Sequence, residues 1–309
     1  MIKKLCIFTF SFSPNRKSML DYLEKIFPKD VELFLFTTKN HKHKYNFKRT
    51  KIVDTNCSKL TCFFELRKFC EENNIQRIVS LGLLPYESFP MIYASIFSKR
   101  DFICYNLGNP IEAIKFYGCK LKIISFFELL LSLITNFFPR KILLTSRDLV
   151  EWYKKIFFLN SQKIFYLPTT IPTDFFKPKN KRLIRKKLGF NQKDKIIIFV
   201  GRIGYLKGID LFLNSVINNP DKRFILIGNL VDRTIKIKNF KNLILLPPKS
   251  QKELVDYYNT ADLCFFPSRL EGVALVPREA MSCGTPTILL DTLSSKSIKE
   301  AIKVPIDNE

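Results

Sequence analysis

Two glutamates eight positions apart, Glu271 and Glu279, are the residues of this chain whose spacing most directly suggests chemistry. Glu271 follows an apolar run that ends at residue 266, so it should lie in the loop beyond the carboxyl end of a β-strand. A helix carrying Glu279 is expected over 274–282, and Gly284 suits the left-handed conformation that closes a helix. Two carboxylates placed in this way can accept hydrogen bonds from two polyhydroxylated groups of one ligand.

The residues around these glutamates suit a phosphate group. Gly272 lets the backbone approach a ligand closely, and the amides of Val273 and Ala274 at the helix start can bind an anion. In an earlier loop, Arg202 and Lys207 also follow an apolar run. Fixed cations there would neutralise a diphosphate and the negative charge that develops as it leaves. We therefore expect no metal ion and no cofactor, and the chain has no Asp-x-Asp pair.

Each signal also has a simpler interpretation. Glu271 and Glu279 could be a solvated pair, and Arg202 and Lys207 could be ordinary surface cations. The order of the two motifs and their strand–loop–helix context favour the functional interpretation. Nothing in the pattern raises the pKa of one carboxyl group against the other, so we interpret the glutamates as ligand-binding groups and not as an acid–base pair.

Short apolar runs alternate with helical patterns, which is typical of parallel sheets covered by helices on both faces. The expected strands are residues 5–10, 31–36, 78–83, 102–105 and 141–145 in the first half, and 195–200, 223–227, 242–246, 262–266 and 287–290 in the second. Three prolines between 167 and 178 interrupt this pattern. We expect an α/β protein with a first domain over 1–168, a linker over 169–180 and a second domain over 181–309. Because ligands collect at the carboxyl ends of parallel strands, the two domains would face a cleft.

A known family shares these motifs. The chain has Gly201-Arg202 with Lys207-Gly208, followed by Glu271-x7-Glu279 and Cys283-Gly284-Thr285-Pro286, and in this it resembles the retaining glycosyltransferases of family 4. The resemblance covers most of residues 140–290 and implies the GT-B architecture of two Rossmann-like domains. It also implies transfer of a sugar from a nucleotide-diphosphate-sugar donor to an acceptor hydroxyl, with retention of configuration and without a metal, in glycan, polysaccharide or glycolipid synthesis.

The resemblance assigns roles to individual residues. Glu271 would contact the donor sugar and Glu279 the ribose, while Arg202 and Lys207 would hold the diphosphate, so that Arg202, Lys207 and Glu271 form the catalytic set. The further donor-binding positions would be Gly201, Ser268, Gly272, Val273, Ala274 and Leu275. The first domain would bind a glycan or lipid-linked acceptor.

The first half departs from that family. Its loop over 11–15 has no glycine, and the only histidines, His41 and His43, lie in a basic loop. Asn106 and Asn109 could supply hydrogen bonds on the acceptor side, or simply form a turn. The last six residues resemble a Val-Pro segment that helices usually follow, so the chain could be a shortened member, be completed by another chain, or be a fragment. A non-catalytic nucleotide-sugar-binding or scaffold protein is the alternative function.

The chain is strongly basic, with 51 Lys and Arg against 28 Asp and Glu and a formal net charge of +23. Residues 177–195 hold nine of these cations and one acid, which could be a solvated helix face or a contact for an anionic membrane surface. Residues 121–138 predict an apolar helix with one polar stripe, either buried or lying in a membrane interface. No run is long and apolar enough to span a bilayer.

These features predict a cytoplasmic protein, with at most a peripheral contact at the membrane face. Nucleic-acid binding has no support beyond the net charge, since no interleaved aromatic–basic motif is present. The eight cysteines form no CxxC pair, and we expect them to be reduced.

Overall fold

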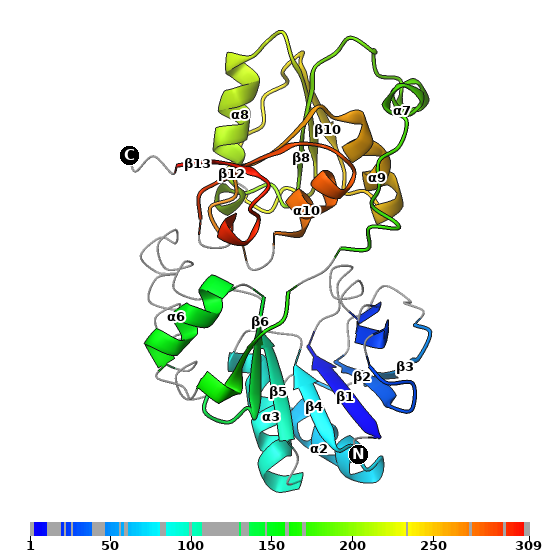
Figure 1. The fold of residues 1–309 in the computed structure, drawn as a ribbon, viewed down its shortest axis with the longest axis vertical. Coiled ribbons are helices and arrows are strands. Elements are labelled where there is room, and N and C mark those ends of the chain that lie inside the picture. The colour runs from blue at the N-terminus through cyan, green and yellow to red at the C-terminus, as the bar shows by residue number, and fades with distance from the viewer. Residues whose placement is uncertain are drawn as a thin grey trace. The chain divides into compact units, whose positions relative to one another are not determined.

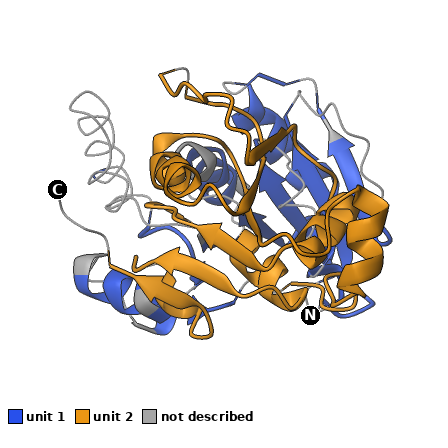
Figure 2. Cartoon of the chain, turned by 90° about the horizontal axis from the view of Figure 1, so that it is seen from above, with its two compact units in different colours: residues 1–170 blue, residues 171–309 orange. Residues whose placement is uncertain are grey.

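The chain folds into two compact units, residues 1–170 and 171–309 (Figure 2). The structure, a computed structural model, describes residues 3–10, 20–21, 23–25, 27–38, 47–55, 57–58, 61–80, 85–98, 101–106, 130, 136–145, 147–157, 161–168, 171–232, 234–271, 274–292 and 295–305. Of the predicted helix 121–138, only Leu130 and residues 136–138 are among them. Residues 171–180 of the predicted linker belong to the second unit, where Phe176 is buried and its carbonyl accepts a hydrogen bond from Ser282.

The first unit is built on a parallel sheet of seven strands in the order β3-β2-β1-β4-β5-β6-β7 (Figure 1). The strands are β1 (Lys4–Thr9), β2 (Glu32–Thr37), β3 (Thr50–Asp54), β4 (Arg77–Ser80), β5 (Asp101–Asn106), β6 (Lys141–Leu144) and β7 (Ile164–Tyr166). The helices whose bounds lie within the described residues are α2 (Cys62–Glu72), α3 (Pro85–Ser98), α6 (Arg147–Phe157) and the 3-10 turn η1 (Ser161–Lys163). Alternate residues of β1 face opposite sides: Phe8 packs in the cluster formed with α2 and α3, and Ile7 packs in the cluster on the other face.

The second unit holds a parallel sheet of six strands in the order β10-β9-β8-β11-β12-β13. The strands are β8 (Ile196–Val200), β9 (Arg223–Ile227), β10 (Leu243–Leu246), β11 (Leu263–Phe266), β12 (Thr287–Leu290) and β13 (Ile302–Val304). The helices are α7 (Lys181–Leu188), α8 (Ile209–Asn218), α9 (Gln251–Thr260) and α10 (Leu275–Ser282), with the 3-10 turns η2 (Tyr205–Lys207) and η3 (Ser295–Ser297).

The second sheet is covered on both faces, as its apolar strands require. Ile198 of β8 packs in the cluster that includes Tyr258 of α9 and Ala280 of α10, whereas Phe199 packs in the cluster of α8. Figure 1 shows α8 and α9 on opposite sides of this sheet. With both faces closed, a ligand of this unit must approach an edge at which the strands end.

All ten predicted strands are present, within a few residues of their predicted bounds. Three further strands, β3, β7 and β13, were not predicted. Each lies at the edge of its sheet. A lysine interrupts the sequence of β3 and of β13, and β7 is only three residues long, so the signals of these strands in the sequence are weak.

Candidate functional site

The carboxyl edge of the second sheet brings the two predicted motifs together. Strands β8 and β11 are neighbours, while the chain goes from β8 to β9 and β10 on one side and from β11 to β12 and β13 on the other. The loops that follow β8 and β11 therefore leave the sheet at the point where its strand order reverses. This is the place at which sheets of this kind bind their ligands.

Lys207 and Glu271, which are 64 residues apart in the chain, meet in the structure. The Lys207 ammonium forms an ion pair with the Glu271 carboxylate and lies 3.4 Å from the Leu270 carbonyl oxygen. The two side chains are 15% and 11% exposed. Both side chains are thus largely shielded from water, and this shielding strengthens their electrostatic action on a ligand. They are still exposed enough for a ligand to reach them.

Two glycines let the backbone segments at this edge approach each other. A Cβ on Gly208, which has φ 69°, would lie 1.8 Å from the carbonyl oxygen of Pro267. A Cβ on Gly228 would lie 1.7 Å from the carbonyl oxygen of Gly201. Only glycine fits at either position. Gly228 is therefore required by the close approach of the loop after β8.

Arg202 follows β8 and Gly201 at this edge, and its side chain is exposed. It has no ion-pair partner within the described part of the chain, so its charge is available to a ligand. Of the predicted phosphate-binding backbone, Gly272 and Val273 lie outside the described residues. Ala274 is buried and precedes α10, which begins at the half-buried Leu275.

Helix α10 confirms the predicted helix and its ending. The amide of Thr285 bonds to the Ala280 carbonyl at 3.0 Å, and the amide of Gly284 bonds to the Met281 carbonyl at 2.9 Å. Gly284 has φ 82°, which is the left-handed conformation that this pair of bonds requires. The helix therefore ends where the sequence indicates, and this fixes the position of Glu279 along it.

Glu279 is buried, and it accepts a 2.8 Å hydrogen bond from the Tyr258 hydroxyl through Oε2. Burial raises the pKa of the Glu279 carboxyl, and the Tyr258 bond opposes this rise only in part. Burial and the neighbouring Glu279 together raise the pKa of Tyr258 well above its usual value. The interpretation that nothing raises the pKa of one carboxyl group against the other is thus wrong, because burial raises the pKa of Glu279 and the sequence does not show how deeply α10 buries it.

Ser268 is buried and braces the loop. Its hydroxyl lies 3.1 Å from the Leu270 carbonyl oxygen and 3.3 Å from that of Leu206. The single hydroxyl proton is thus directed at backbone oxygens. The Ser268 hydroxyl therefore stabilises the loop at the site. Its predicted contact with the donor stays a prediction.

Sequence reasoning missed Arg269 and its partners. Arg269 is 8% exposed and binds both oxygens of Asp210, at 2.7 and 2.6 Å. It also donates to the Tyr205 carbonyl at 2.8 Å, and its guanidinium lies 4.1 Å from the centre of the Tyr205 ring. The available signal was its position, two residues before Glu271, together with an acid that follows Lys207-Gly208.

The remaining predicted positions are less defined. Asn106 ends β5, but its side chain and all of Asn109 lie outside the described residues, as do His41 and His43. No group of three or more His, Cys, Asp or Glu side chains that could share a metal ion occurs in the described ranges. The seven described cysteines form no disulfide bonds.

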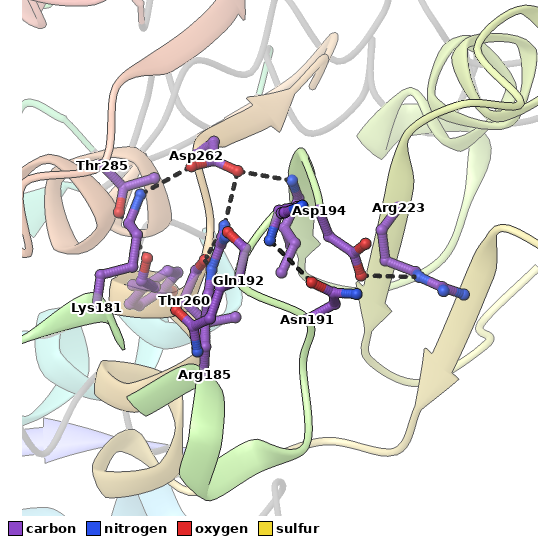
Figure 3. A network of polar contacts seen from close by, with 12 residues as sticks. Lys181, Arg185, Asn191, Gln192, Asp194, Arg223, Thr260, Asp262 and Thr285 are labelled. Atoms are coloured by element: carbon purple, nitrogen blue, oxygen red, sulfur yellow. Dashed lines mark hydrogen bonds and ion pairs between the residues drawn. The ribbon is translucent and has the colours of Figure 1, made fainter. Parts of the chain in front are cut away.

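Two cations of the basic run 177–195, Lys181 and Arg185, belong to a second polar cluster (Figure 3). This cluster lies at the amino ends of the strands of the same sheet, where Ile196 begins β8 and Asp262 precedes β11. Arg185, which is 4% exposed, donates to Asp262 at 2.8 Å and to the Thr260 and Gln192 carbonyls at 3.1 and 2.8 Å. Lys181 also binds Asp262, at 3.0 Å, and the amide of Ile196 completes the site at 2.8 Å.

A neighbouring carboxylate takes two more cations of this run. Asp256 binds Lys179 and Lys187, each at 2.6 Å. Four of the nine cations are therefore paired within the protein, so neither predicted interpretation, a solvated face or an anion contact, describes the whole run. Exposed side chains without an ion-pair partner in the described part of the chain are those of Lys177, Arg182, Lys186, Lys193 and Lys195.

Comparison with known proteins agrees with this geometry. Residues 180–302 match the family model described as glycosyl transferases group 1. This stretch belongs to that family. The group 1 domain covers nearly all of the second unit and contains every residue predicted to bind the donor.

Relatives of the group 1 domain include the D-inositol 3-phosphate glycosyltransferases of Mycobacterium sp. (strain KMS) and Mycolicibacterium smegmatis. Each is 33% identical over 129 residues, which are 38% of this chain and 29% and 30% of the respective relatives. The match thus spans under a third of the length of these relatives.

Solved structures match both units. Sucrose-phosphate synthase from Thermosynechococcus elongatus has a TM-score of 0.81 at 13% identity, over 99% of this chain and 86% of that chain. Anabaena Alr3699/HepE in complex with UDP-glucose has a TM-score of 0.74 at 12% identity, over 98% and 86%. At these identities the likeness concerns the fold, and it shows that the two parallel sheets have the GT-B architecture that the sequence predicts.

Proposed function

We propose that the protein transfers a sugar from a nucleotide-diphosphate-sugar donor to an acceptor hydroxyl, with retention of configuration. The observation that carries the proposal is the Lys207–Glu271 pair at the carboxyl edge of the group 1 domain. The pair places a cation and a carboxylate side by side, as a ligand with a diphosphate next to a sugar requires. The acceptor would bind on the first unit.

The roles of the side chains follow from their charge. Lys207 and Arg202 would neutralise the diphosphate as its bond to the anomeric carbon breaks. The acceptor oxygen would form its new bond on the same face of the sugar and pass its hydroxyl proton to the leaving diphosphate oxygen. Glu271 would accept hydrogen bonds from sugar hydroxyls and Glu279 from the ribose. In this proposal the fixed cations take the place of a metal ion, and the donor is the only nucleotide required.

The first test is a thermal-shift panel of uridine, guanosine and adenosine diphosphates and their sugars, because a ligand that binds the folded state raises the melting temperature. UDP-glucose is the first donor to try, since a solved structure of the same fold contains it. Donor hydrolysis and transfer to sugar acceptors are then measured with the donor that binds. Failure of every nucleotide to stabilise the protein would contradict the proposal.

A non-catalytic nucleotide-sugar-binding protein is the second candidate. The departures of the first half from the family 4 pattern favour it, since the loop over 11–15 has no glycine and the only histidines are His41 and His43. The same assays separate the two candidates. Donor binding without hydrolysis or transfer across the acceptor panel would support the binding protein.

We also propose a peripheral contact with anionic membranes, to which the predicted segments 121–138 and 177–195 would contribute. No described helix is long and apolar enough to cross a membrane. The unpaired cations of α7, Arg182 and Lys186, support the contact, and Leu183 beside them is 63% exposed.

Sedimentation with phosphatidylcholine vesicles, with and without phosphatidylglycerol, tests this contact. The R182E/K186E variant should lose the part of binding that depends on the anionic lipid. The K236E/K238E variant reverses two other exposed cations of the same unit and should keep that binding. Equal binding by both variants would remove α7 from the proposal.

A further inference from the structure

We infer that Arg269 is a positioning residue, which clamps the loop after β8 to the loop after β11 so that Lys207 and Glu271 face one ligand. The inference rests on the proposed function for its consequence in catalysis. The contacts of Arg269 on which the inference is based do not depend on the proposed function.

The contacts of Arg269 lie on both sides of Lys207 in the chain. On one side its Nη1 donates to the carbonyl of Tyr205, and on the other its two terminal nitrogens bind Asp210 in the first turn of α8. Lys207 lies between these two anchoring points. The Lys207 side chain is flexible, but the backbone segment that carries it is held on both sides by Arg269.

The backbone of the second loop completes the clamp. The amide of Arg269 donates to the Leu206 carbonyl at 2.9 Å, and the Ser268 hydroxyl lies 3.3 Å from the same oxygen. Glu271 follows two residues later. The segments that carry the ammonium and the carboxylate are therefore held to each other by groups other than the ion pair itself.

Only an arginine can make this set of contacts. The planar guanidinium binds a carboxylate through two parallel bonds and stacks on an aromatic ring at the same time, whereas an ammonium is a point charge. Arg269 uses both capacities, through Asp210 and through the Tyr205 ring. Placement matters because a charge that is fixed before the reaction stabilises the leaving diphosphate without reorganisation.

The test compares R269K with R185K. Both substitutions replace a nearly buried arginine of the same unit that binds an aspartate and at least one backbone carbonyl, but Arg185 lies at the amino ends of the strands. Melting temperatures should fall in both variants. The kcat of transfer should fall about tenfold or more in R269K, with the donor KM changed less, and should stay near the wild-type value in R185K.

A second measurement does not depend on turnover. The rate at which an amine-acylating reagent modifies Lys207 is followed by mass spectrometry, with Lys222 as the internal reference. R269K should speed this modification because the Lys207–Glu271 pair loosens, while R185K should not. Equal modification rates in the two variants would overturn the inference. A wild-type protein without turnover, in which R269K alone speeds modification, would contradict the proposed function and leave the clamp intact.

Discussion

The carboxyl edge of the second sheet, where its strands end, and the amino edge, where they begin, carry similar groups but have different roles. At the carboxyl edge Arg269 binds Asp210 and a backbone carbonyl. At the amino edge Arg185 binds Asp262 and two backbone carbonyls. Both arginines are nearly buried, at 8% and 4% exposure. Their immediate chemistry is therefore almost the same.

The difference lies in what surrounds each arginine. At the amino edge, Lys181 and the Ile196 amide occupy the remaining capacity of Asp262. Burial alone would raise the pKa of Asp262, but the hydrogen bonds from Ile196, Lys181 and Arg185 together lower it, so this aspartate is held as a satisfied anion. At the carboxyl edge Arg202 has an exposed charge with no ion-pair partner in the described part of the chain. The charged groups of the amino edge are paired with one another and stabilise the fold, whereas the carboxyl edge has a cation that can bind a ligand.

The largest effect that this comparison predicts is on turnover at the carboxyl edge. Lys207→Ala should lower kcat roughly 100-fold to 1000-fold, as the loss of one group that stabilises developing charge does. The fold should stay intact, with a lower melting temperature because Glu271, whose side chain is 11% exposed, loses its ion-pair partner. Lys236→Ala, which removes an exposed lysine of the same unit, is the control. Near-normal transfer by Lys207→Ala would abolish the functional distinction between the edges.

The second prediction concerns the glycines. Gly208→Ala should destabilise the protein by about 3 kcal/mol, because the added methyl group meets the Pro267 carbonyl and the residue has a positive φ. Gly189→Ala at the end of α7 is the matched control. Gly189 has φ 76° with nothing within 4 Å of the added atom, so only the conformational cost of about 1 kcal/mol remains. Chemical denaturation measures both, and equal losses would contradict the close approach of the two loops.

The third prediction concerns stability at the amino edge. Arg185→Met should lower the free energy of unfolding by about 2 kcal/mol, since the Thr260 carbonyl and Asp262 lose charged donors. The kcat should be unchanged at temperatures where the variant is folded. A loss of turnover that exceeds the loss of folded protein would show that the amino edge also acts in the reaction.

The smallest effect is a pH dependence at Glu279. Its pKa is raised from 4.5 in the folded state, so its contribution to stability is fully present below about pH 4.5 and is lost as the pH rises through the folded pKa. Glu279→Gln keeps an acceptor for Tyr258 and cannot ionise. The variant should gain stability relative to the wild type as the pH rises above 4.5. If the melting temperatures of the two proteins differ by the same amount at every pH in this range, the raised pKa of Glu279 is contradicted.

Much of the fold could be predicted from the sequence, because the responsible signals are local. Apolar runs such as 195–200 and 262–266 identify central strands, and Gly284 marks the end of α10 through its left-handed conformation. The edge strands β3, β7 and β13 could not be predicted in this way. Their pairing depends on the strand beside them, and their sequences are either interrupted by a lysine, in β3 and β13, or only three residues long, in β7.

The sequence by itself determined which residues carry the charge and where the strands of the second sheet end, since both depend on residue type and spacing over short distances. Only the tertiary structure decided which charges meet. Arg269 and Asp210 are 59 residues apart and Arg185 and Asp262 are 77 apart, and each pair forms because the strand order makes β8 and β11 neighbours. Burial, which separates Arg185 and Glu279 from an exposed cation such as Arg202, was decided in the same way, because it depends on how helices cover the sheet.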